Sequence, residues 1–424
     1  MIKDTEQTGH SAPATDPVTQ DADIGHPRPD GQLSETGLLL FAVASAIVTA
    51  NAYYIHPIVS SVADHFGVSK AMIGTVPAFN QLALALGIFL LLPLGDRFSN
   101  RTLTLVFVTG QVLCLFVMAV AQEFSLFLGA STLLGFFTIA PYLLPTYVSK
   151  RVPVTRLGHS TAMLTAGIIF GILVARMGAG VIAEYMDWRF VYYLAAVLML
   201  TVSVFLFFIM EGREQDGEDR DKPGYFSLIL SIFPMIRKYP EILISGAIQG
   251  LGFGAFLAVW MGIGLHLPSE DMGYGTDVPG YLAGLTIFNL IVTPRLGRWA
   301  DRIGPRKARL ILAVSQLLGS LLFGFTGHDL WLLIIPILIT NTGGPALDVA
   351  SRMTFLTEAP QIRTRLMTIY IVMMFIGGGV ASWGGTAAYD YAGWTGTACL
   401  AIGFSVMVLA LSLWSYLWKG RQER

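Results

Sequence analysis

The sequence predicts an all-α membrane protein with twelve transmembrane helices arranged as two similar six-helix halves. The 424 residues are 54% hydrophobic and only 13% charged, and their mean hydropathy is +0.62, which excludes an ordinary soluble domain. Two groups of apolar runs, six in each, are long enough to cross a hydrocarbon core of about 30 Å. Landmark residues recur between the two groups at a spacing of about 205 residues.

The apolar runs divide the chain into five expected regions. They are a disordered cytoplasmic tail (1–36), an N-terminal half (37–210), a cytoplasmic linker with a surface helix (211–240), a C-terminal half (241–418) and a second cytoplasmic tail (419–424). The first tail lacks apolar periodicity, and the linker begins with a stretch of charges that no bilayer would hold. The runs begin near Gly37, Ala71, Thr102, Phe124, Thr161, Trp188, Glu241, Gly280, Lys307, Leu330, Leu366 and Trp394.

The basic residues predict the orientation in the membrane. Of the 27 lysines and arginines, all except Lys70, Arg176 and Arg189 fall in segments on the same side as both termini. Because basic residues are retained on the cytoplasmic side, we expect both termini to be cytoplasmic. Lys70 and Arg189 then lie outside, and Arg176 lies within a span.

Four pairs of residues show that the two halves repeat. They are Asp96 with Asp301, Pro141 with Pro345, Gly171 with Gly377 and Trp188 with Trp394, each about 205 residues apart. A shared offset across four landmarks favours parallel repeats related by an axis along the membrane normal.

One of these landmarks belongs to a loop motif that occurs in both halves, between the second and third helices. The complete copy has the order Gly-x-x-x-Asp-Arg-x-Gly-x-Arg and comprises Gly297, Asp301, Arg302, Gly304 and Arg306. The weaker copy retains Asp96, Arg97 and Arg101, but has Leu92 and Ser99 at the glycine positions. An acidic group at such a helix end can sit against the N-terminus of another helix, and the arginines keep the loop inside.

This motif resembles the signature loop of the major facilitator superfamily of secondary transporters. Residues 50–57, Ala-Asn-Ala-Tyr-Tyr-Ile-His-Pro, are in addition similar to the Ala-Asn-x-Tyr-Tyr-x-Gln-Pro stretch of a bacterial efflux-type subgroup. The resemblance implies two halves that rock about a substrate site near the midplane, with the signature loops acting on that movement. Two departures from drug-proton antiporters are Ser131, where an Arg is common, and Arg176, where a Pro is common.

Several polar and aromatic residues are candidates for the substrate cavity. In the first helix, a rotation of about 100° per residue places Asn51 and Tyr54 on one face and Tyr53 and His56 on the opposite face. Only one of these pairs can face the cavity, and the sequence does not choose between them. His56, in addition, puts a titratable ring where the subgroup has an amide.

A stripe on the seventh helix is the second candidate for the cavity wall. Gln249, Phe253, Phe256 and Trp260 share one face, which fits either helix packing or cavity lining. On the second, fourth and eighth helices we name Gln81, Tyr142 and Asn289 as further candidates.

Arg176 is the third candidate. An isolated charge inside a span costs at least about 2 to 3 kcal/mol on insertion scales. Its guanidinium offers a fork of donors to a carboxylate or phosphate, so we expect an anion or counter-ion site. The alternative is a buried pair with a carboxylate of a neighbouring helix.

Proton coupling has two candidate residues, because acidic residues are missing from the middle of the spans. They are His56 and Asp348, although Asp348 has Arg352 one turn further on and can pair with it. The Gly-Gly-Pro sequence at 343–345 predicts a bend just before Asp348.

These observations favour a proton-coupled exporter of a small, anionic or amphipathic organic solute in the bacterial inner membrane. The alternatives are an importer of an anionic metabolite and, more remotely, a non-transporting membrane receptor. The sequence holds no nucleophile motif and no metal-ligand spacing, so we expect neither an enzyme nor a metal or cofactor site. The expected partners are the lipid bilayer and a small-molecule substrate, without nucleic acid, and we expect a monomer.

Overall fold

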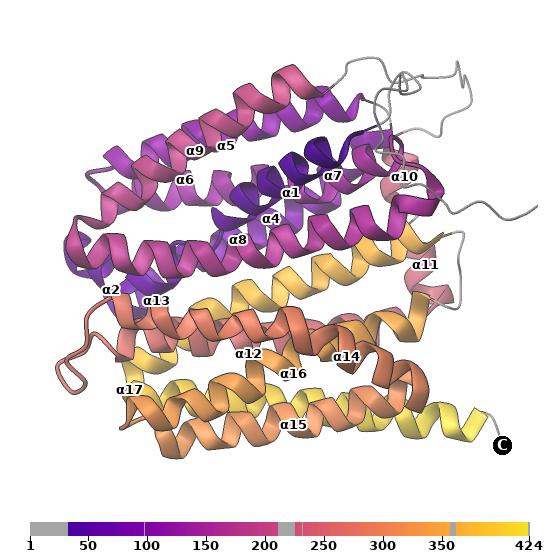
Figure 1. The fold of residues 1–424 in the computed structure, drawn as a ribbon. Coiled ribbons are helices and arrows are strands. Elements are labelled where there is room, and N and C mark those ends of the chain that lie inside the picture. The colour runs from indigo at the N-terminus through magenta and orange to yellow at the C-terminus, as the bar shows by residue number, and fades with distance from the viewer. Residues whose placement is uncertain (1–32, 97, 211–224, 231, 357–361, 423–424) are drawn as a thin grey trace, which may run out of the picture. The chain divides into compact units, whose positions relative to one another are not determined.

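The computed structural model describes residues 33–96, 98–210, 225–230, 232–356 and 362–422, and within these ranges it is helical, without strands (Figure 1). Ten of the described helical stretches are long and apolar enough to span a membrane. The last of them, Arg365–Trp418, holds two spans, because Ala392 and Gly393 leave the helical region and Gly393 has φ 59°. Its 54 residues are far more than the roughly 20 that one span needs.

The remaining span is divided into three short elements. The α13 helix (Asp277–Ala283) continues through a 3-10 turn (Gly284–Ile287) into α14 (Phe288–Ile303), and α14 contains Pro294. None of the three pieces is long enough alone, but together they cover the predicted eighth span. The described helices therefore account for the twelve predicted spans, and the fold class is confirmed.

The helices follow the predicted order along the chain. The first six spans are α1 (Glu35–Ala50) with α2 (Ile55–Phe66), α3 (Lys70–Ile73) with α4 (Thr75–Leu91), α5 (Asn100–Val120), α6 (Phe124–Phe137) with α7 (Ala140–Ser149), α8 (Leu157–Tyr185) and α9 (Trp188–Ile209). The second six are α12 (Glu241–His266), α13 with α14, α15 (Pro305–Thr326), α16 (Leu330–Leu356) and the two parts of α17 (Arg363–Gln422). Below, the end of the bundle near Lys70 is called the predicted outer end.

The repeat is visible in how the helices pack. Gly171 of α8 lies against the backbone carbonyl of Ala46 in α1, and Gly377 of α17 lies against the backbone of Gly250 in α12. Both members of each contact recur at an offset of about 205 residues. In both halves a Cβ would collide with the opposite backbone, so the close approach requires glycine.

Proline divides the first span. Pro57 has no backbone N–H and cannot donate to the carbonyl of Tyr53, so the regular ladder ends at Ala50 and resumes at Ile55. Tighter turns fill the gap, with the N–H of Tyr53 donating to Ala50 and that of His56 to Tyr53. Residues 51–54 thus depart from the regular rotation on which the sequence-based faces depend.

Side-chain hydrogen bonds compensate for a second break, which Pro141 causes in the fourth span. Pro141 deprives the carbonyl of Phe137 of its helical donor, and that carbonyl instead accepts from the N–H of Ile139 at 2.8 Å and from the side chain of Gln111 of α5 at 3.0 Å. The side-chain oxygen of Gln111 accepts from the Asn51 amide at 2.9 Å. Asn51 thereby links the first, third and fourth spans.

The predicted surface helix is resolved as two short helices, α10 (Tyr225–Leu230) and α11 (Ile232–Lys238). The Tyr225 hydroxyl donates to the carbonyl of Leu90 at 2.7 Å. Most of the predicted first tail and the charged start of the linker lie outside the described residues. The region boundaries and the cytoplasmic location of the termini therefore stay predictions.

Candidate functional site

Arg176 lies inside the bundle on α8 and is 1% exposed. Three aromatic rings surround its guanidinium carbon, those of Trp260, Phe256 and Tyr53 at 4.7, 5.0 and 5.2 Å from the ring centroids. Two of the rings come from α12 and one from the break in the first span. The faces of aromatic rings attract a cation, so this cage stabilises the charge without neutralising it.

Among the described residues, His56 is the hydrogen-bond partner of this guanidinium. The Nη2 atom of Arg176 lies 2.9 Å from Nδ1 of His56. Because a guanidinium only donates, Nδ1 accepts, and in the neutral ring the proton is on Nε2. Nε2 of His56, together with Nε and Nη1 of Arg176, is buried without a partner among the described residues. The cluster therefore presents only donors, as a receptor for an anion does.

Within the described part of the chain, no carboxylate pairs with Arg176. The ion pairs found there involve Glu35, Glu241 and Asp348, each with other basic residues. The alternative of a structural pair therefore has no support within these residues. A buried cation without a counter-ion is costly unless a ligand supplies the charge.

The two faces of the first span have different surroundings. Tyr53 and His56 pack edge to face at 5.4 Å and face Arg176, whereas Asn51 is hydrogen-bonded to Gln111. Tyr53 and Tyr54 both belong to the hydrophobic core, but the ring contact with the Arg176 guanidinium is made by Tyr53. We assign Tyr53 and His56 to the candidate site and Asn51 to helix packing.

The stripe on α12 continues into a chain of aromatic rings. Phe253 stacks on Phe256 at 6.1 Å and packs edge to face on Phe375 of α17 at 5.9 Å. Phe375 in turn meets Tyr142 of α7 at 6.4 Å. The chain thus runs from the Arg176 cage across both halves. Gln249 lies near its end and approaches the sulfur of Met374 at 3.6 Å.

Gln81 and Asn289 are buried, and each has a side-chain oxygen without a partner among the described residues. For Gln81, on α4, both ends of the amide are unpaired, and the residue is 0% exposed. A buried amide without hydrogen bonds is unusual, because leaving each polar group unpaired costs about 1 to 3 kcal/mol. Their role in binding stays a prediction.

Asp348 is held by two neighbours at the other end of α16 from Leu330. The guanidinium of Arg352 lies 2.8 Å from Oδ1 and 2.7 Å from Oδ2 of the carboxylate, and the hydroxyl of Tyr370 donates to Oδ1 at 2.7 Å. The predicted pairing with Arg352 is therefore present. The helix itself continues through Pro345 without interruption.

The signature loops have fewer contacts than the sequence suggested. Asp301 and Arg302 are exposed, and within the described residues Asp301 has no hydrogen bond to the N-terminus of another helix. Gly304 has φ 91°, which explains the glycine before α15, and Gly297 packs near Val349. In the weaker copy, Arg101 donates to the carbonyl of Phe207 at 2.9 Å, Asp96 ends a 3-10 turn, and Arg97 lies outside the described residues.

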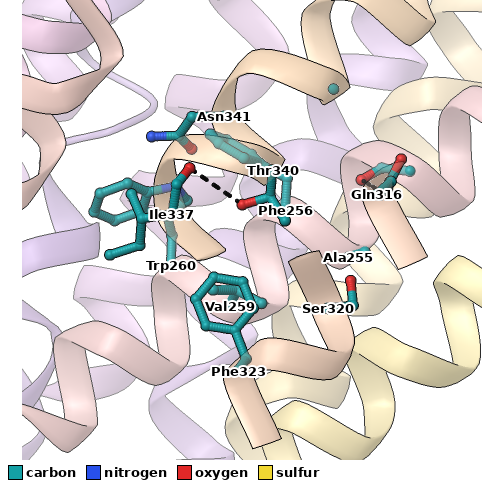
Figure 2. A pocket seen from close by; sticks show the side chains of 12 residues that line it. Ala255, Phe256, Val259, Trp260, Gln316, Ser320, Phe323, Ile337, Thr340 and Asn341 are labelled. Atoms are coloured by element: carbon teal, nitrogen blue, oxygen red, sulfur yellow. Dashed lines mark hydrogen bonds between the residues drawn. The ribbon is translucent and has the colours of Figure 1, made fainter. Parts of the chain in front are cut away.

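Two features escaped the sequence reading. Arg306 of the loop reaches Glu241, which also pairs with Arg309 at 3.0 Å, so a buried charge cluster joins α12 to α15. The second feature is a small pocket of about 20 Å³ between α12, α15 and α16 (Figure 2). Phe256 and Trp260 separate it from Arg176, and the polar side chains on its wall include Gln316 and Asn341. A hydropathy pattern cannot reveal either feature, because both depend on which helices meet.

Several bacterial proteins, named as transporters or as a multidrug resistance protein, resemble this chain over most of its length. YgaY of Escherichia coli K12, which is named as an uncharacterized transporter, is 27% identical over 400 residues, covering 93% of this chain and 99% of its own. Transporter SCO4007 of Streptomyces coelicolor is 26% identical, covering 92% and 90%. Multidrug resistance protein MdtG of Salmonella arizonae is 22% identical, covering 77% and 81%.

Solved transporter structures share the fold at low identity. Nucleoside transporter NupG superposes with a TM-score of 0.71 at 13% identity, covering 89% of this chain and 98% of its own. A D-xylose-proton symporter gives 0.69 at 15% identity, covering 88% and 96%.

The profile of the Major Facilitator Superfamily matches residues 41–361 and, in a second match, 286–423. Relatives, fold and profile agree that this is a multi-pass membrane transporter and not an enzyme. The chain belongs to the Major Facilitator Superfamily.

Proposed function

We propose that this transporter moves a small organic anion across the bacterial inner membrane by alternating access, with the anionic group bound at Arg176. The supporting observation is the buried guanidinium with unpaired donors beside an Nε2 donor of His56. A carboxylate, sulfonate or phosphate would supply the missing acceptors and the missing charge. The aromatic chain toward Tyr142 suits an apolar or aromatic body on the same solute.

Export is the favoured direction. It rests on the multidrug resistance name of the MdtG relatives and on the resemblance of the first helix to an efflux-type subgroup. Asp348 is the proposed proton carrier, because its side chain is part-exposed and its protonation would break the ion pair with Arg352, which would couple a proton to a change of contacts. Import of an anionic metabolite is the alternative.

The central experiment measures ligand binding to the purified protein in detergent. A panel of aryl and alkyl carboxylates, sulfonates and phosphates is screened by thermal shift, since a ligand that binds only the folded state raises the melting temperature. The affinity of the best ligand is then measured for Arg176→Lys and Arg176→Gln. Ser382→Ala is the matched control, because Ser382 holds the equivalent position on α17 and is also buried.

Arg176→Gln should weaken binding by about ten- to a hundredfold, the value of one or two charge-assisted hydrogen bonds. Arg176→Lys should weaken it less, because the ammonium keeps the charge and loses only the forked geometry. Ser382→Ala should bind as the wild type does. Unchanged affinity in a folded Arg176→Gln protein would refute the anion site.

A further inference from the structure

Two seams join the halves at the predicted outer end, and they are related by the internal repeat. One seam lies between α8 and α13, and the other lies between α17 and α3. In the first, the Glu184 carboxylate accepts from the N–H of Thr276 at 2.7 Å and from its hydroxyl at 3.1 Å. In the second, the Asp390 carboxylate accepts from the N–H of Ala71 at 3.4 Å.

The correspondence between the seams is residue by residue. Glu184 and Asp390 are about 205 residues apart, and so are Ala71 and Thr276. In each seam a carboxylate near the outer end of one helix therefore accepts from a backbone N–H at the start of the facing helix. The repeat has preserved an interaction between the halves as well as the packing within them.

Small residues bring the helices of each seam together below the carboxylates. Gly180 and Gly280 meet in the first seam, where a Cβ on either would press on the opposite backbone. In the second seam, Gly74 lies directly against the side chain of Thr386. These four positions also correspond through the repeat, at about 205 residues.

The first seam includes the backbone of Arg176. Arg176, Gly180 and Glu184 follow one another at intervals of four residues and lie on roughly the same face of α8. A Cβ on Gly280 would lie 3.0 Å from the carbonyl oxygen of Arg176 itself. Separation of α8 from α13 would therefore free the backbone segment that carries the guanidinium.

We propose that Glu184 and Asp390 are equivalent but unequal latches that hold the predicted outer end closed, with Glu184 the stronger. Glu184 receives two donors, at 2.7 and 3.1 Å, whereas Asp390 receives one long contact. Hydrogen bonds to a charged acceptor are stronger when they are short. Loss of the Glu184 contact should therefore favour the open outer end more than loss of the Asp390 contact.

The test measures distances across each seam by double electron-electron resonance. Cys114→Ala and Cys399→Ala remove the native thiols from the described chain. Spin labels are placed at the exposed pair Tyr185→Cys and Tyr281→Cys for the first seam. The exposed pair Met72→Cys and Tyr391→Cys serves the second seam.

Three single substitutions are compared in these labelled proteins. Glu184→Ala should raise the ratio of the long-distance to the short-distance population by about tenfold, as the loss of a charge-assisted hydrogen bond predicts. Asp390→Ala should raise it by about threefold at most. Asp187→Ala is the matched control, because its carboxylate caps α9 by accepting from Arg189 within one half, at 2.8 Å.

Thr276→Val provides a second, milder variant. It removes the hydroxyl donor and keeps the N–H, so the expected shift lies between the control and Glu184→Ala. Equal distributions in Glu184→Ala and Asp187→Ala, or a larger shift in Asp390→Ala than in Glu184→Ala, would overturn the proposal. No ligand is needed, so the result is independent of the proposed anion site.

Discussion

Arg176 and Ser382 occupy equivalent places on α8 and on the first part of α17, but their surroundings differ completely. The Ser382 hydroxyl donates to the carbonyl of Gly378 on its own helix at 2.8 Å, whereas Arg176 points into an aromatic cage built by other helices. The glycines five residues before them, Gly171 and Gly377, make equivalent contacts with the backbone of a facing helix. The repeat therefore duplicates packing and leaves the charge on one side only, which is how a symmetric scaffold can hold an asymmetric site.

The same contrast appears at Gln111 and Gln316, which are also about 205 residues apart. Gln111 is held at both ends by Asn51 and Phe137. Gln316 donates to the carbonyl of Gly252 at 3.4 Å, and its oxygen has no partner among the described residues. It borders the pocket instead. The glutamine of the N-terminal half is therefore hydrogen-bonded at both ends, whereas the equivalent glutamine of the C-terminal half lines a pocket.

The largest expected effect is loss of folding when either shared glycine contact is broken. Gly171→Leu and Gly377→Leu should each cost about 3 kcal/mol or more, because the opposing backbone cannot move aside. Gly178→Leu on α8 and Gly403→Leu on α17 are the controls, since a Cβ at these positions meets nothing within 4 Å. Size-exclusion profiles and thermal unfolding in detergent measure the outcome. A large difference between the two halves would show that the contacts are not equivalent.

A smaller effect should separate the two glutamines. Gln111→Leu leaves the Asn51 amide unpaired and removes one of the two donors to the Phe137 carbonyl, which keeps the N–H of Ile139 at 2.8 Å, so about 1 to 3 kcal/mol is lost for the buried unpaired amide. Gln316→Leu removes one long hydrogen bond and adds apolar volume beside the pocket, so the change should stay within about 1 kcal/mol. Thermal unfolding of both variants gives the comparison. Equal destabilisation would mean that the pocket is not a real difference between the halves.

The smallest expected effect is the change in ligand affinity when the signature loop is altered. Asp301 is exposed at the end of α14, on the side away from the predicted outer end, so Asp301→Asn should slow transport and change affinity by no more than about threefold. Uptake into vesicles and ligand binding by the same preparation are measured side by side. Loss of binding in a stably folded Asp301→Asn protein would place the loop in the binding site.

The spans could be predicted because a membrane imposes them, and the repeat could be predicted because landmark residues keep a nearly constant offset. Each crossing must be long, apolar and helical, so hydropathy marks it, and the Pro141 and Trp188 landmarks mark the repeat. The site could be predicted only in part. The structure gives Asn51 and His56 different neighbours, and the face toward Arg176 depends on the position of α12 and on the break before Pro57, which the sequence pattern does not contain. The unequal latches depend on contacts between residues that are far apart in the sequence, which no local pattern contains.

The contact of Gly280 with the Arg176 carbonyl has a thermodynamic consequence. Arg176, which would bind the ligand through its side chain, contacts Gly280 through its backbone in the first seam. Ligand binding and the opening of the outer end are therefore thermodynamically linked. If opening of the outer end changes the affinity for a ligand by some factor, the bound ligand changes the equilibrium constant for opening by the same factor. Ligand affinity measured in Glu184→Ala or Asp390→Ala would then report the change in the free energy of opening, without any direct observation of the movement.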